Sequence, residues 1–142
     1  MTTIETNPVQ ASKGWNIGLW VAQAILAAMF LMAGATKLMS GSAELVAMGM
    51  GWAENAPFLL IKFIGLAEVA GGLGLILPTA TRIMPHLTKW AAAGLAVIMV
   101  LAAGLHIIRG EFEVVPVNVI LFALAAFVIW GRTNKTPIAP RA

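Results

Sequence analysis

Four stretches of this sequence are each long and apolar enough to cross a lipid bilayer. They run over Trp15–Lys37, Pro57–Leu77, Leu87–Ile108 and Val114–Gly131. A helix needs about 20 apolar residues to cross roughly 30 Å of hydrocarbon, and these runs lack the alternation of barrel strands. Only helices or closed barrels satisfy the backbone in lipid, so the sequence predicts an all-α, four-helix transmembrane bundle. The second run is bounded by Pro57 and Pro78.

The composition also indicates lipid as the solvent. Hydrophobic residues make up 60% of the 142 residues and charged residues only 11%. A soluble domain of this size leaves a large share of its area exposed and could not hide so much apolar surface. The chain has no cysteine, which excludes disulfides and thiol redox chemistry of its own. No basic patch is interleaved with aromatic residues, so we expect no nucleic-acid partner.

Charges outside the spans predict the orientation. With four crossings, both termini and the loop at 78–86 share one side. Its basic residues are Lys13, Arg82, Lys89, Arg132, Lys135 and Arg141. The acids of the loops lie on the other side: Glu44, Glu54, Glu111 and Glu113. We therefore expect a multi-pass protein of the bacterial cytoplasmic (inner) membrane with both termini in the cytoplasm. Residues 1–14 and 133–142 would be poorly ordered tails flanking a transmembrane domain over 15–132.

The connection between the first two spans, Leu38–Ala56, is long enough to hold structure of its own. Ser42 is a candidate N-cap, with Glu44 in the first turn of a helix that would follow. Several apolar residues come next. We predict a short interfacial helix and a turn, with Trp52 near the lipid headgroups.

A single acidic residue, Glu68, stands in the middle of the second span. On a helical wheel its face also carries Gly65, Gly71 and Gly72. Small residues let helix backbones approach closely, so we expect this face to pack on neighbouring helices and Glu68 to point inward. Glu68 lies ~15 Å below Phe58, near the bilayer midplane. Two interpretations stay open: a polar group that fixes helix packing, or a proton carrier in a cavity.

Each of the other spans carries a polar residue near its outer end. Lys37, His106 and Asn118 therefore fall in the same half of the bilayer as Glu68. Lys37 can also snorkel to the interface, and a histidine beside an acid can relay protons. Asn118, like Gln23, is expected to hydrogen-bond across helices. Glu68 is thus the candidate catalytic, proton-exchanging residue, and Lys37, His106 and Asn118 are the candidate ligand-binding residues.

We predict no metal site and no covalently bound cofactor. Without cysteine or a paired-histidine spacing, the usual zinc and haem patterns fail, and the eight methionines are scattered. P-loop, Rossmann and Gly-x-Ser-x-Gly motifs are absent as well. The chain has no self-contained catalytic machinery, so whether it is an enzyme stays open.

Three segments follow one another in a distinctive order: AGATKL at Ala33–Leu38, GLAEVAGGLGLILP at Gly65–Pro78 and AAGLHIIRGEFEVVP at Ala102–Pro116. Their succession resembles the DoxX-like family of small four-helix membrane proteins. The resemblance covers about 15–132 and places the family's motif positions at Lys37, Glu68 and His106. Some members are linked to oxidoreductase assemblies, including subunits of a thiosulfate:quinone oxidoreductase and a mycobacterial membrane complex associated with oxidative-stress defence.

The resemblance implies a membrane subunit of an oxidoreductase complex, with a polar pocket for quinone or another small molecule. Its partners would be other membrane or extracytoplasmic subunits, or a second copy of the chain. Because this chain lacks cysteine, any sulfur chemistry would need a partner's thiols. A structural or assembly subunit is the alternative. A small transporter ranks last, because the spans lack the short, Gly/Pro-interrupted pairs of repeat-built carriers.

Overall fold

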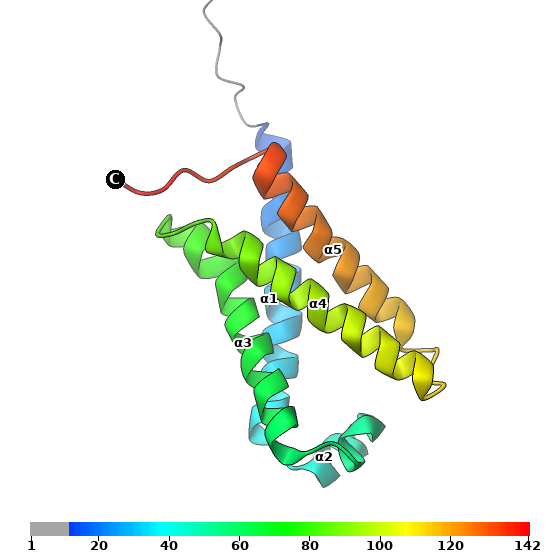
Figure 1. Ribbon diagram of the computed structural model, residues 1–142. Coiled ribbons are helices and arrows are strands. Elements are labelled where there is room, and N and C mark those ends of the chain that lie inside the picture. Colours follow the sequence, from blue (N-terminus) through cyan, green and yellow to red (C-terminus); the bar gives the residue numbers. More distant parts are fainter. Residues whose placement is uncertain (1–11) are drawn as a thin grey trace, which may run out of the picture.

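The computed structural model describes residues 12–142, and this part of the chain is helical with no strand (Figure 1). Its long helices are α1 (Lys13–Met39), α3 (Phe58–Thr81), α4 (Leu87–Ile108) and α5 (Val115–Asn134). The short helix α2 (Ser42–Ala47) and the 3₁₀ turn η1 (Gly51–Glu54) connect α1 to α3. All four long helices have the length and apolar composition of membrane spans. The predicted all-α, four-helix bundle is therefore confirmed.

Helix α3 differs from the prediction at its end. Pro78 does not end the helix, which continues to Thr81. A proline inside a helix removes one N–H donor, and such losses are tolerated where side chains satisfy the freed carbonyl groups. The Thr81 hydroxyl donates to the Leu77 carbonyl at 2.7 Å, and the Gln23 amide of α1 donates to the Leu75 carbonyl. Both side chains add hydrogen bonds to carbonyl groups that lie just before the proline.

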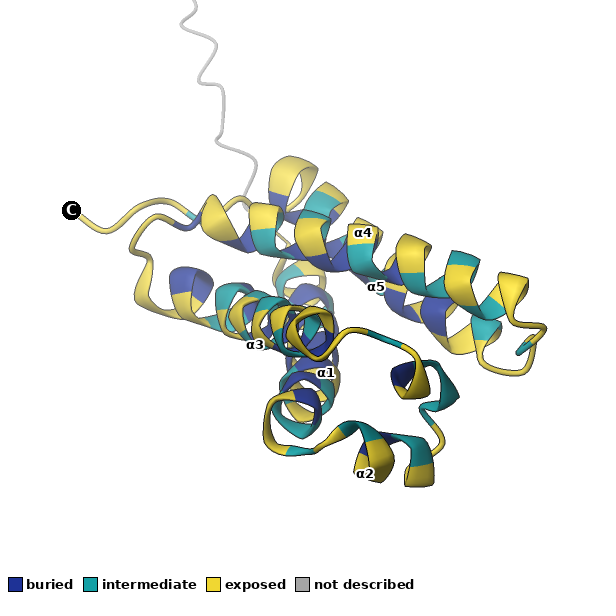
Figure 2. Cartoon of the chain, turned by 60° about the horizontal axis from the view of Figure 1, so that its bottom comes forward, coloured by how far each residue is buried: buried dark blue, intermediate teal, exposed yellow. Residues whose placement is uncertain are grey.

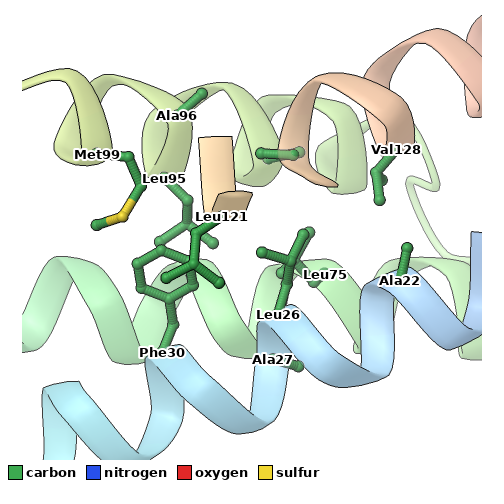
Figure 3. Packing of buried hydrophobic residues seen from close by; sticks show 12 residues of the cluster. Ala22, Leu26, Ala27, Phe30, Leu75, Leu95, Ala96, Met99, Leu121 and Val128 are labelled. Carbon is green, nitrogen blue, oxygen red and sulfur yellow. The ribbon is translucent and has the colours of Figure 1, made fainter. Parts of the chain in front are cut away.

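The four long helices pack as two crossing pairs. Helix α1 lies against α3, α4 lies against α5, and further contacts join α3 to α4 and α1 to α5 (Figures 1 and 2). The shared core contains Leu26, Phe30, Leu95 and Leu121, which meet between the pairs (Figure 3). Many large apolar side chains instead face outward, and this is the surface expected of helices surrounded by lipid.

The connections gather at the two ends of the bundle. The α3–α4 turn lies at the end that holds the start of α1 and the end of α5, whereas α2, η1 and the α4–α5 turn lie at the opposite end (Figure 1). The N-cap of α2 is Gly41, not the predicted Ser42. The Glu44 carboxylate accepts a hydrogen bond from the Gly41 N–H at 3.0 Å. The helix therefore starts one residue earlier than predicted, with Ser42 as its first residue.

The structure describes the two predicted tails only in part. Most of the expected tail at 1–14 lies outside the described residues, and α1 already begins at Lys13. At the other terminus, Arg82 donates from Nε to the Ala139 carbonyl at 3.0 Å, and the Arg141 N–H donates to the Arg82 carbonyl at 2.8 Å. These bonds place the C-terminal segment against the α3–α4 turn.

Candidate functional site

Two glycines bring α1 and α3 into backbone contact in the half of the bundle that holds the end of α1 and the start of α3. A Cβ atom on Gly34 would lie 2.6 Å from the Gly65 carbonyl oxygen. A Cβ atom on Gly65 would lie 2.9 Å from both the Gly34 carbonyl oxygen and the Lys37 Cβ. Real Cβ atoms do not approach so closely, and only glycine allows this contact. The sequence expectation that the glycine face of α3 packs on a neighbour is thus met by α1.

This contact positions a buried ion pair between the same helices. Lys37 Nζ lies 2.8 Å from Glu68 Oε2 and 3.1 Å from Oε1, so the lysine bridges both carboxylate oxygens. The side chains are only 9% and 5% exposed. In a low-dielectric interior, each charge needs the other to offset the cost of leaving water. Lys37 is therefore the partner that holds the carboxylate of Glu68 within the span.

A second lysine neutralises the end of α1. The Nζ atom of Lys62 donates to the carbonyl groups of Lys37, Leu38 and Ser40 at 2.8, 3.0 and 2.8 Å. Carbonyl groups at a helix C-terminus lack intrahelical partners and carry partial negative charge, so a cation here is favourable. Lys62 thus caps α1.

Asn118 lies on α5 in the same half of the bundle as the ion pair. It is buried one turn before Leu121, which contacts the core that contains Phe30 of α1. Its Nδ2 atom has no hydrogen-bond partner within residues 12–142. A buried amide N–H without an acceptor costs free energy, so this donor is suited to an acceptor from outside the described chain.

His106 is not joined to the ion pair by a hydrogen bond. Its Nδ1 atom lies 2.7 Å from Glu111 Oε2, and Arg109 Nε donates to Glu111 Oε1 at 2.8 Å. This cluster occupies the α4–α5 turn, where a Cβ atom on Gly51 of η1 would lie 3.2 Å from Arg109 Nη2. The cluster therefore lies close to the segment between α1 and α3, and His106 forms its hydrogen bond there and not with Lys37 or Glu68.

A comparison with models of protein families identifies the family of this chain. The model of the DoxX-like family matches residues 21–128, which include all four candidate residues. The chain belongs to the DoxX-like family. No curated protein and no solved structure matched this DoxX-like chain in the same comparisons.

Another buried polar residue of this DoxX-like protein, Arg132, was not predicted from the sequence. Arg132 is 4% exposed and lies at the opposite end of the bundle from the ion pair. Its Nε atom donates to Gln23 Oε1 at 2.7 Å, and Nη1 donates to Asn16 Oδ1 at 2.7 Å. Gln23 also donates to Thr79 at 3.3 Å, so its expected hydrogen bonding across helices is observed. We had assigned Arg132 to the surface because the fourth span was ended at Gly131.

The geometry allows proton exchange and hydrogen bonding rather than metal binding. Within residues 12–142, no group of three or more His, Asp and Glu side chains could hold a metal ion. The Lys37–Glu68 pair of this DoxX-like protein provides an acidic and a basic group in contact, and Asn118 provides a free donor. The ion pair can accept, hold or pass a proton, and the Asn118 amide can separately donate to a carbonyl oxygen.

The cluster of His106, Arg109 and Glu111 predicts a pH dependence of the stability of the fold. Hydrogen bonds from His106 and then from Arg109 hold the pKa of Glu111 below its ordinary value of 4.5. A carboxyl with a lowered pKa in the folded state stabilises the fold above its ordinary pKa and loses that contribution as the pH falls through the lower value. The thermal midpoint of the wild type should therefore exceed that of Glu111→Gln near neutral pH, and the difference should vanish in acid. Glu113→Gln, in the same turn, is the control, and a difference that persists in acid would contradict the assignment.

Proposed function

We propose that this DoxX-like protein is a membrane subunit of an oxidoreductase assembly, and that Lys37 and Glu68 form its proton-exchanging polar site. The observation that carries the proposal is the ion pair itself, with 2.8 Å between Nζ and Oε2 and almost no exposure. Insertion of an acidic residue at a helix centre costs ~2.5–3.5 kcal/mol, and charged residues retained at such positions commonly mark proton or ligand pathways. The chain has no cysteine, so a partner subunit would carry the electrons.

A quinone is the small molecule that this set of donors suits. Its carbonyl oxygens are acceptors, and reduction of a quinone consumes protons together with electrons. Lys37 and the unpartnered amide of Asn118 would donate to such an oxygen, and Glu68 would supply a proton. His106 is already engaged by Glu111 and would not contact the ligand. The buried Asn118 donor is the feature that favours a carbonyl-bearing ligand.

The same proposal includes a location in the bacterial cytoplasmic membrane with both termini in the cytoplasm. The support is the charge distribution: within residues 12–142, the end of the bundle that holds the α3–α4 turn carries basic side chains and no Asp or Glu. Basic residues favour the cytoplasmic side of a membrane. Lys37, Glu68 and Asn118 then lie in the extracytoplasmic half, within reach of extracytoplasmic or membrane-embedded partners.

A structural or assembly role is the second candidate, and a groove between α3 and α4 favours it. The groove has a volume of about 390 Å³ and is lined mainly by small residues, including Ala67, Ala70, Gly71 and Gly94. Small residues on a lipid-facing surface allow another helix to approach closely. In this role the ion pair would only fix α1 against α3, and a partner helix or a second copy would occupy the groove.

Purification from native membranes in a mild detergent tests the proposed function. We expect the wild-type protein to copurify with a partner that carries a visible redox cofactor and with extractable quinone. In Lys37→Met/Glu68→Leu, which leaves no unpaired charge, the partner should remain and the quinone per chain should fall, whereas a purely structural role predicts loss of the partner. Glu113→Gln, an exposed acid of the α4–α5 turn, is the control. Absence of both partner and quinone from the wild type would contradict the proposal.

A further inference from the structure

A cavity at the end of the bundle opposite the ion pair has a strongly basic lining. Its volume is about 240 Å³, and its polar lining comes from Thr79, His86, Lys89 and Arg132. A water molecule occupies ~30 Å³ in the liquid, so the cavity has room for a phosphate group and some water. Pro137, Ile138 and Pro140 of the C-terminal segment form the remaining wall with Pro85. Among residues 12–142, no acidic side chain lines the cavity.

Arg132 brings a buried charge to this cavity, and no carboxylate within residues 12–142 pairs with it. The atoms that accept its hydrogen bonds are neutral: Gln23 Oε1, Asn16 Oδ1 and the hydroxyl and carbonyl oxygens of Thr136. Its Nη2 atom has no partner within residues 12–142. A buried cation is costly unless a counter-charge accompanies it, and an arginine fork matches phosphate oxygens well. An anion in the cavity would supply the charge that the described chain lacks.

The surroundings of the cavity place it at the level of the lipid headgroups. Trp15 and Trp130 pack edge to face near the same helix end, with ring centroids 5.3 Å apart. Lys135 Nζ lies 5.3 and 5.4 Å from these two ring centroids. Tryptophan and lysine at the end of a span are typical of the membrane–water interface. A basic pocket between transmembrane helices at this depth suits the phosphate of an anionic lipid.

We propose that this cavity binds a phosphate group, contributed by the headgroup of an anionic phospholipid, with Arg132 and Lys89 as its charged contacts. Arg132 is fixed by its bonds to α1 and to Thr136, and Lys89 is half-buried on α4 with His86 one turn before it. The ligand would thus connect α4 and α5 to the C-terminal segment. The inference does not depend on the proposed oxidoreductase role.

Lipid retention in the purified full-length protein tests the proposal. The protein is placed in bilayer discs of phosphatidylcholine and phosphatidylglycerol, extracted with detergent, and analysed by native mass spectrometry. We expect phosphatidylglycerol to be retained in preference to phosphatidylcholine, and Lys89→Gln to lower that preference about fivefold. Lys135→Gln, which removes a cation at the same end but outside the cavity, should leave the preference unchanged. Equal retention of the two lipids, or no difference between Lys89→Gln and Lys135→Gln, would overturn the headgroup assignment.

A second arm separates a headgroup from free phosphate. The protein in discs of phosphatidylcholine alone is titrated with inorganic phosphate at constant ionic strength, and the thermal midpoint is followed. If phosphate raises the midpoint of the wild type but not of Lys89→Gln, and no phosphatidylglycerol is retained, the site binds the free anion. If the protein shows no lipid preference and phosphate does not raise the thermal midpoint, the phosphate site is overturned altogether. Lipid retention and the thermal midpoint are both compared between the wild type and Lys89→Gln, so Arg132 does not need to be replaced.

Discussion

Replacing Lys37 with methionine should lower the free energy of unfolding by about 3 kcal/mol or more, because it leaves the carboxylate of Glu68 buried without its partner. The wild-type pair is bridged at 2.8 and 3.1 Å and lies between helices in backbone contact, so no exposed surface is at hand to hydrate the remaining charge. The effect can be measured as the shift in the unfolding transition of the detergent-solubilised protein in a denaturing-surfactant titration.

The double variant Lys37→Met/Glu68→Leu distinguishes a lost partner from lost packing. Removal of both charges at once leaves no unpaired group, and such replacements by apolar residues of similar volume are often neutral or stabilising. We expect it to recover most of the stability lost in Lys37→Met. Lys13→Met, at the exposed start of the same helix, is the control and should change little. A double variant as unstable as the single one would show that the ion pair does not account for the loss.

Gly34→Ala should also destabilise the bundle, by about 1–3 kcal/mol, because the added methyl group overpacks a contact that cannot yield. The new Cβ would meet the Gly65 carbonyl oxygen at 2.6 Å and the Val69 backbone nitrogen at 2.9 Å. Both are backbone atoms of α3, so the two helices would have to separate and stretch the ion pair between them. The same unfolding titration measures the loss.

Gly18→Ala provides a matched control on the same helix. A Cβ atom at Gly18 would have no neighbouring atom within 4 Å. Alanine in the interior of a helix is more favourable than glycine by roughly 0.5–1 kcal/mol, so this variant should be unchanged or more stable. The two substitutions are chemically identical, and opposite signs are expected only because of the local packing. Equal effects would contradict the backbone contact between α1 and α3.

Much of this architecture could be predicted from the sequence because lipid restricts the choice of structure. Apolar runs of the right length had to be helices, and α4 begins and ends at the predicted residues. The inward direction of Glu68 followed from glycines on its helical face, since a lipid-facing surface has no use for them. Lys37 was among its expected neighbours, and the structure places it in contact with the carboxylate.

What could not be predicted depends on turns and on chain segments outside the spans. His106 pairs with Glu111, which lies beyond the end of α4 and after Gly110, whose φ of 73° sets the direction of the turn. Hydropathy ended the fourth span at Gly131, although helical spacing continues the buried face of α5 through Val128 to Arg132. An extension of that spacing by one residue would have identified Arg132. Its neighbours on α1 and in the C-terminal segment required the three-dimensional structure.

The quinone content of the native assembly that carries Lys37→Met/Glu68→Leu tests the central claim most directly. This variant should fold and keep its protein partners, because it contains no unpaired charge. If Lys37 and Glu68 form the polar site of an oxidoreductase subunit, the quinone extracted per chain should fall at least tenfold, a loss of about 1.4 kcal/mol in binding. Quinone retained at the wild-type level, in an assembly that keeps its partners, would contradict the claim and leave the ion pair a purely structural role.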